Sequence, residues 1–150
     1  MTRVAIALGS NDGDRKSHLD FAVGRLSTIF SSITVSRWYE TEPVGVGLQP
    51  LFLNGAAVGR TTLSARELLD TLLAIERERG RERPFRNAPR TLDLDLVLFG
   101  DRVIDEPGLS VPHPRFRERQ FVLGPLSEIA PDMIDPVTGR TVQELLDSSR

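Results

Sequence analysis

The sequence of 150 residues contains no cysteine, a single lysine and only two histidines. The lack of cysteine excludes disulfide bonds, thiolate metal sites and cysteine nucleophiles. With only His18 and His113, a histidine-rich zinc site is not expected either. No apolar run approaches the roughly 20 residues needed to span a bilayer, and residues 1–8 lack the cleavage site of a signal peptide. We therefore expect a cytoplasmic protein with no membrane partner.

Arginine carries nearly all of the positive charge, because Lys16 is the one lysine among 19 basic residues. Residues 77–90 hold six arginines and two glutamates, so this segment carries a net charge of +4 while the whole chain carries −2. A local cationic cluster on an otherwise acidic protein favours a small polyanionic ligand over a long nucleic acid.

The apolar pattern predicts a single α+β domain over residues 1–150. The order strand, helix, strand, strand, helix, strand is that of the ferredoxin-like fold, an antiparallel sheet with helices on one face. Asp12 or Asp14 is expected to cap the first helix, and Ser64 with Glu67 the second. Strands are expected over 4–8, 33–39, 52–61 and 92–99, helices over 15–30 and 64–80, and further short strands and helices towards the C-terminus, including 121–129 and 142–146.

The last core strand carries two aspartates at alternate positions. Side chains alternate between the faces of a strand, so Asp93 and Asp95 share one face and the leucines around them share the other. Such a pair can hold one or two Mg²⁺ ions, with substrate phosphates and water as the other ligands. The alternative is the solvent face of an amphipathic strand. The neighbouring arginines favour a polyphosphate site.

The segment before this strand is rich in arginine and proline. Pro84 and Pro89, together with the missing apolar period, argue against a helix. Guanidinium groups bind phosphate oxygens at any physiological pH, so we expect a mobile loop that closes over a charged substrate. A solvated charged loop is the alternative. The arginines concerned are Arg81, Arg83, Arg86 and Arg90.

Three further patterns are candidates for binding. Glu76 lies on the apolar face of its helix and needs a partner, either a salt bridge or a ligand hydroxyl. His113 stands between two prolines and precedes three arginines in five residues, which suits a triphosphate or a structural hydrogen bond. Phe52 and Asn54, which follow the loop 39–45, offer a stacking plane and a donor–acceptor pair for a flat heterocycle. Ordinary loop and core roles are the alternative.

Taken in chain order, four segments resemble the 6-hydroxymethyl-7,8-dihydropterin pyrophosphokinase family. The resemblance covers nearly the whole chain and implies transfer of the pyrophosphoryl unit of ATP to the hydroxymethyl oxygen of the pterin. AMP is the other product, and the reaction belongs to tetrahydrofolate biosynthesis. The segments are LGSN at 8–11, RNAPRTLDLDLV at 86–97, Pro112-His113 with Arg119 and Phe121, and PLSEIAP at 125–131.

The same resemblance implies roles for individual residues. Asp93 and Asp95 correspond to ligands of two Mg²⁺ ions, and with the four loop arginines they form the catalytic set. The implied ATP contacts are Glu76, Arg83, Arg86, Arg90, Ser110, His113 and Arg119. The implied pterin contacts are Thr41, Val44, Phe52, Asn54, Asp93 and Phe121, with the ring stacked between the two phenylalanines.

Two other functions use the same residues. A metal-dependent phosphohydrolase would use the aspartate pair on a different phosphate ester, and a nucleic-acid-binding domain would use the arginine loop. A nucleic-acid binder should show a broad basic surface, which the net charge of −2 does not favour. We therefore expect a monomeric enzyme whose partners are ATP, Mg²⁺ and the pterin, with no nucleic acid.

Overall fold

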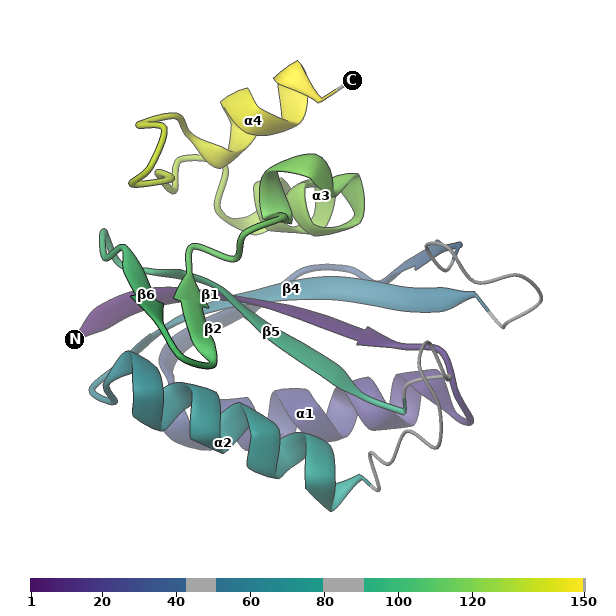
Figure 1. Ribbon diagram of the computed structural model, residues 1–150. Coiled ribbons are helices and arrows are strands. Elements are labelled where there is room, and N and C mark those ends of the chain that lie inside the picture. Colours follow the sequence, from purple (N-terminus) through teal and green to yellow (C-terminus); the bar gives the residue numbers. More distant parts are fainter. Residues whose placement is uncertain (43–50, 80–90, 150) are drawn as a thin grey trace.

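The computed structural model describes residues 1–42, 51–79 and 91–149. The central sheet has the strand order β2-β4-β1-β5, with every neighbouring pair antiparallel, and β3 pairs with part of β4. This order confirms the ferredoxin-like core (Figure 1). Its elements are β1 (Thr2–Ser10), α1 (Arg15–Ile29), β2 (Ser31–Val35), β3 (Tyr39–Thr41), β4 (Phe52–Thr61), α2 (Ala65–Glu78) and β5 (Asp93–Phe99).

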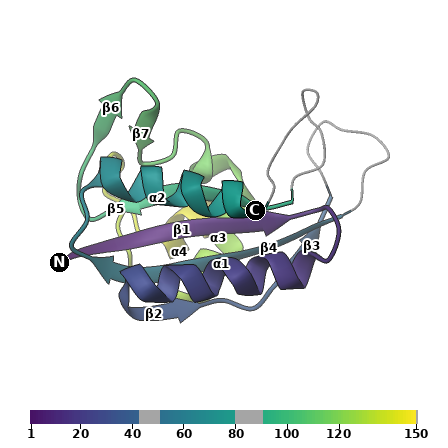
Figure 2. The same cartoon turned by 90° about the horizontal axis from the view of Figure 1, so that it is seen from below.

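Both core helices begin where their capping residues predict. The side chain of Asp14 accepts a hydrogen bond from the backbone N–H of Ser17 at the start of α1. Ser64 and Glu67 form a reciprocal capping box at the start of α2. The two helices lie side by side on one face of the sheet, where their apolar sides cover a core cluster that includes Ile6 and Leu8 (Figure 2). Among the described residues, no helix combines the length and apolarity needed to cross a membrane.

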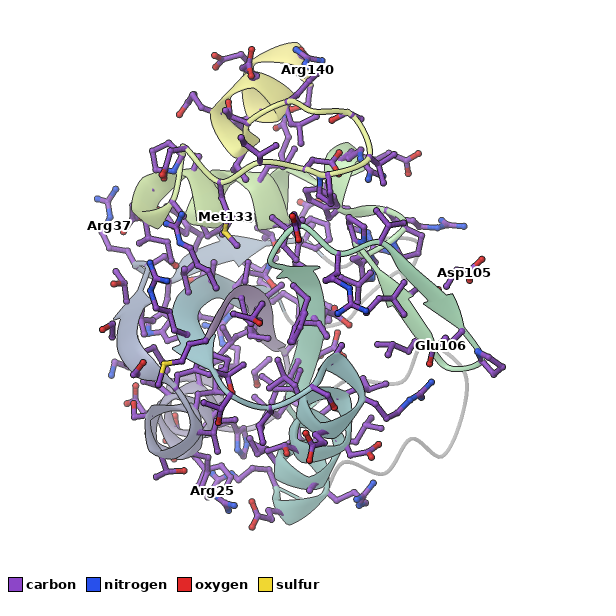
Figure 3. The ribbon with its side chains drawn as sticks, turned by 90° about the vertical axis from the view of Figure 1, so that its left-hand side faces the viewer. Arg25, Arg37, Asp105, Glu106, Met133 and Arg140 are labelled. Carbon is purple, nitrogen blue, oxygen red and sulfur yellow. The ribbon has the colours of Figure 1, made fainter. Side chains whose placement is uncertain are left out.

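The opposite face of the sheet is also covered, by the C-terminal helices that were expected from the sequence without a position. Helix α3 (Gln120–Ile129) packs there, and α4 (Val142–Ser148) packs on the outer side of α3 (Figure 1). They bury a second cluster that includes Ala7 and Ala56, and Met133 lies in this layer (Figure 3). A third layer forms because β1 is apolar on both faces, so each face has to be removed from water. Between β5 and α3 the chain forms β6 (Ile104–Glu106), β7 (Leu109–Val111) and the short 3₁₀ helix η1 (Phe116–Glu118).

The strand predicted over 33–39 is wrong as a continuous element, because it breaks between β2 and β3. The backbone N–H of Ser36 donates to the carbonyl oxygen of Ala56, as in a regular strand pair. The return bond differs, because the Ala56 N–H donates at 2.9 Å to the side-chain hydroxyl of Ser36. Trp38 then lies over Gly55, where a Cβ would come within 2.4 Å of the indole ring. The Ser36 hydroxyl therefore replaces a backbone acceptor of the sheet, and Trp38 occupies the space over Gly55. Together these two features end β2 at Val35, and β3 begins only at Tyr39.

Candidate active site

One row of paired residues crosses the sheet near the C-terminal end of β1. Gly9 on β1 pairs with Asp93 on β5 on one side and with Asn54 on β4 on the other. Two residues earlier on β1, Ala7 pairs with Asp95. Ala7 packs in the cluster beneath α3, and alternate residues of a strand share a face. The two aspartates and Asn54 therefore lie on the same face, the one that α3 partly covers.

Gly9 makes room for the side chain of Asn54. A Cβ at Gly9 would lie 2.7 Å from Asn54 Oδ1 and 3.6 Å from the Phe52 ring. The amide nitrogen of Asn54 donates a hydrogen bond to Thr41 Oγ1 on β3, and Asn54 is only 7% exposed. Three of the expected pterin contacts, Thr41, Phe52 and Asn54, therefore form one cluster beside Gly9, whereas Val44 lies outside the described residues.

His113 links this face to the start of α3. Its backbone N–H donates to Val97 on β5 at 3.0 Å, and the Arg115 N–H donates to His113 Nδ1 at 3.1 Å. Burial lowers the pKa of His113, the positive charge of Arg119 lowers it further, and the Asp93 carboxylate acts in the opposite direction. The imidazole is thus neutral at pH 7 with its proton on Nε2, within electrostatic reach of Asp93 and Arg119.

Arg119 and Phe121 stand together at the first turn of α3. Arg119 is the residue that precedes the helix, and its guanidinium carbon lies 5.7 Å from the centroid of the Phe121 ring. Phe121 is half-buried against the cluster beneath the helix. The expected ATP contact and the expected pterin contact are therefore neighbours, on the helix that covers the aspartate face.

Arg117, one of the three arginines expected near phosphate, has a structural partner instead. Its guanidinium donates two hydrogen bonds to the fully buried carboxylate of Asp135, which also accepts bonds from the Val137 N–H and the Thr138 hydroxyl. Burial raises the pKa of Asp135, but these hydrogen bonds outweigh burial and hold it below its usual value. This pair fixes η1, and nothing in the sequence indicated it.

Glu76 and Ser110 lie apart from the Asn54 cluster. The carboxylate of Glu76 is 2% exposed and accepts the backbone N–H of Leu94 at 2.7 Å. Leu94 stands between the two aspartates, so Glu76 fixes the backbone of β5 at that point. Ser110 is exposed on β7, three residues before His113. The remaining expected site residues lie outside the described residues: Arg81, Arg83, Arg86 and Arg90.

The donor set on β5 suits a hard divalent cation. Asp93 and Asp95 offer carboxylate oxygens from alternate positions of one strand, and Mg²⁺ prefers one or two carboxylates with water and phosphate oxygens. Over residues 1–42, 51–79 and 91–149, no group of three or more metal-binding side chains gathers. Within that part of the chain, the Asp93–Asp95 pair suits a Mg²⁺ ion whose remaining ligands come from a substrate and water.

Comparison with known proteins identifies the family. Residues 5–131 match the family described as 7,8-dihydro-6-hydroxymethylpterin-pyrophosphokinase, or HPPK. The chain belongs to the HPPK family. It is 44% identical over 146 residues to the 2-amino-4-hydroxy-6-hydroxymethyldihydropteridine pyrophosphokinase of Pseudomonas aeruginosa, covering 96% of this chain and 90% of that protein. The Synechocystis protein of the same name is 43% identical over 145 residues, covering 95% of this chain and 73% of that protein.

Solved HPPK structures share the fold. The crystal structure of wild-type Plasmodium falciparum HPPK-DHPS superposes with a TM-score of 0.76 at 15% sequence identity, over 98% of this chain. The present chain spans 44% of that longer chain. The sequence reasoning assigned no role to Gly9 in LGSN, whose missing Cβ makes room for Asn54.

Proposed function

We propose that this chain catalyses the HPPK reaction on the sheet face that carries Asp93, Asp95 and Asn54. The hydroxymethyl oxygen of 6-hydroxymethyl-7,8-dihydropterin attacks the β-phosphorus of ATP and forms the new O–P bond. The bond between the β-phosphorus and the oxygen that bridges to the α-phosphorus breaks, AMP leaves, and the hydroxyl proton passes to solvent. The product is the pterin diphosphate of tetrahydrofolate biosynthesis.

The observation that carries this proposal is the row Asn54–Gly9–Asp93 across three neighbouring strands. Strands lie about 4.8 Å apart, so the backbones of Asn54 and Asp93 are roughly 10 Å apart on one face. The amide of Asn54 offers the donor and acceptor that the edge of a pterin requires, and Phe52 and Phe121 offer aromatic planes for its ring. A ring held at Asn54 places its hydroxymethyl arm towards the aspartates.

The polyphosphate would lie between β5 and the start of α3. His113 supplies a neutral Nε2–H donor and Arg119 a fixed positive charge. Asp93 and Asp95 would hold two Mg²⁺ ions. When bound, these ions would neutralise phosphate charge and orient the phosphate oxygens. The loop arginines, Arg81, Arg83, Arg86 and Arg90, are assigned to the same task from sequence alone. Pyrophosphoryl transfer needs positioning and charge neutralisation more than covalent help.

We further propose that the active unit is a monomer with one domain, because β1, β3, β4, β5 and α3 bring the expected site residues together within a single fold. Size-exclusion chromatography with light scattering at the enzyme concentrations used for kinetics tests this point. A dimer that dissociates together with loss of activity would contradict it.

The deciding experiment is incubation of the protein with Mg²⁺, ATP and the hydroxymethyl pterin, followed by analysis of the nucleotides. We expect AMP to form in step with the pterin diphosphate, and expect both to vanish in an Asp93→Asn variant that keeps its melting temperature. ADP or free phosphate would indicate a kinase or phosphohydrolase instead. Binding without turnover would favour a binding module.

A further inference from the structure

Glu128, on the last turns of α3, joins this helix to the strand segment that carries Thr41. One carboxylate oxygen accepts the backbone N–H of Arg37 at 3.0 Å. The other accepts the Tyr39 hydroxyl and, at 3.3 Å, the Nε–H of Arg37. The Glu128 side chain is 26% exposed, whereas that of Arg37 is 79% exposed at the edge of the molecule (Figure 3). Of these contacts, the bond between Glu128 and Tyr39 is the one that joins α3 to β3 itself.

Both ends of this contact lead to residues of the proposed pterin site. Tyr39 pairs with Asn54 and stands two residues before Thr41, on the same face of the short strand β3. Phe121 precedes Glu128 by seven residues on α3, so the two lie about 10 Å apart along the same face of the helix. The helix packs on β4 and also touches β3.

We propose that Glu128 is a positioning residue for the pterin: through Tyr39 it fixes β3, which carries Thr41, against α3, which carries Phe121. This inference rests on the proposed function, because it explains part of the affinity for the pterin at the same site. Glu128 itself touches neither substrate.

The charge states of the two groups are those that this hydrogen bond requires. The hydrogen bond from Tyr39 lowers the pKa of Glu128, so the carboxylate is ionised at neutral pH. The same bond raises the pKa of Tyr39, so the phenol keeps the proton that it donates. The start of α3 is held separately, because η1 before it is fixed by the pair of Arg117 and Asp135. Arg119 and Phe121 both lie at that start, so loss of the Glu128 contact should act mainly through β3 and Thr41, and should affect the pterin side more than the ATP side.

The test compares Tyr39→Phe, Glu128→Gln and the double variant in steady-state kinetics with ATP and the pterin varied separately. Tyr39→Phe removes one oxygen atom and is the variant least able to disturb folding. We expect the pterin KM to rise about tenfold, the loss typical of a hydrogen bond to a charged acceptor, with the ATP KM within about twofold of wild type. Glu128→Gln keeps an amide oxygen that can accept from Tyr39, so its effect should be smaller, and the double variant should match Tyr39→Phe, in which that hydrogen bond is already absent.

Glu106→Gln is the matched control. Glu106 lies on β6 and forms a salt bridge of 3.2 Å with Arg66 of α2. It lies on the side of the molecule opposite Arg37 (Figure 3). Like Glu128→Gln, the Glu106→Gln variant removes one negative charge from an exposed ion pair. It should leave the KM values for ATP and for the pterin unchanged. An unchanged pterin KM in folded Tyr39→Phe and Glu128→Gln, or an equal rise for both substrates, would overturn the inference. Wild-type protein that forms no AMP would instead refute the proposed function.

Discussion

Replacing Gly9 with alanine adds one methyl group to the face of β1 that carries the candidate site. The new Cβ would stand 2.7 Å from Asn54 Oδ1, whereas ordinary contacts of this kind begin at 3.4 Å. The Asn54 amide therefore has to withdraw by about 0.7 Å or turn away. Either movement breaks its hydrogen bond to Thr41 and removes the amide from the position proposed to read the pterin edge.

The expected cost follows from that single polar contact. A hydrogen bond whose partners stay buried is worth about 1–2 kcal/mol, which corresponds to a roughly 5- to 30-fold higher pterin KM. The KM for ATP should stay near that of wild type, because the nucleotide is assigned to the α3 and β5 side. Steady-state kinetics with each substrate varied in turn measures the split, and thermal unfolding confirms that the variant is folded.

Two further variants make this test specific. Gly24→Ala adds the same methyl group to α1, where nothing lies within 4 Å, so it should leave pterin affinity unchanged and stabilise the helix by up to about 1 kcal/mol. In an Asn54→Ala background, Gly9→Ala should add little, because the displaced amide is already absent. A pterin KM that stays at the wild-type value in folded Gly9→Ala would refute the role given to Asn54.

The other predictions concern the metal site, the arginine loop and the segment before α3. Asp95→Ala should abolish AMP formation and leave the melting temperature near that of wild type; a near-normal rate would remove the metal role from this residue. Arg83→Ala should lower kcat more than it weakens ATP binding measured by calorimetry, and equal values for both proteins would mark the loop as solvated surface. Asp135→Asn should destabilise the protein by about 2–4 kcal/mol and lower its melting temperature by about 5–15 °C, since Arg117 loses a buried ionised partner. Because the folded-state pKa of Asp135 is lowered, its stabilising effect is complete above the ordinary aspartate pKa of about 4 and is lost as the pH falls further; denaturant unfolding of both proteins between about pH 3 and pH 6 should show this difference shrink with acidification.

Local interactions account for what the sequence determined. Asp14 and Ser64 cap their helices through bonds to residues three positions away, so the sequence alone places both helix starts. The alternation of Leu92, Leu94 and Leu96 with the two aspartates follows from the two-residue period of a strand, and all three leucines lie in the cluster beneath α1 and α2. The order of strands and helices along the chain predicts the ferredoxin-like fold.

The tertiary structure decided which distant residues meet. Strand register pairs Gly9 with both Asp93 and Asn54, and no local pattern specifies that register. The bond between Tyr39 and Glu128 joins residues 89 positions apart, and that between Arg117 and Asp135 joins residues 18 apart. The helices on the second face were likewise decided by the apolar surface of the assembled sheet. Thus the sequence specifies the carboxylates and the amide, and packing of the sheet between two helical layers brings them to one face.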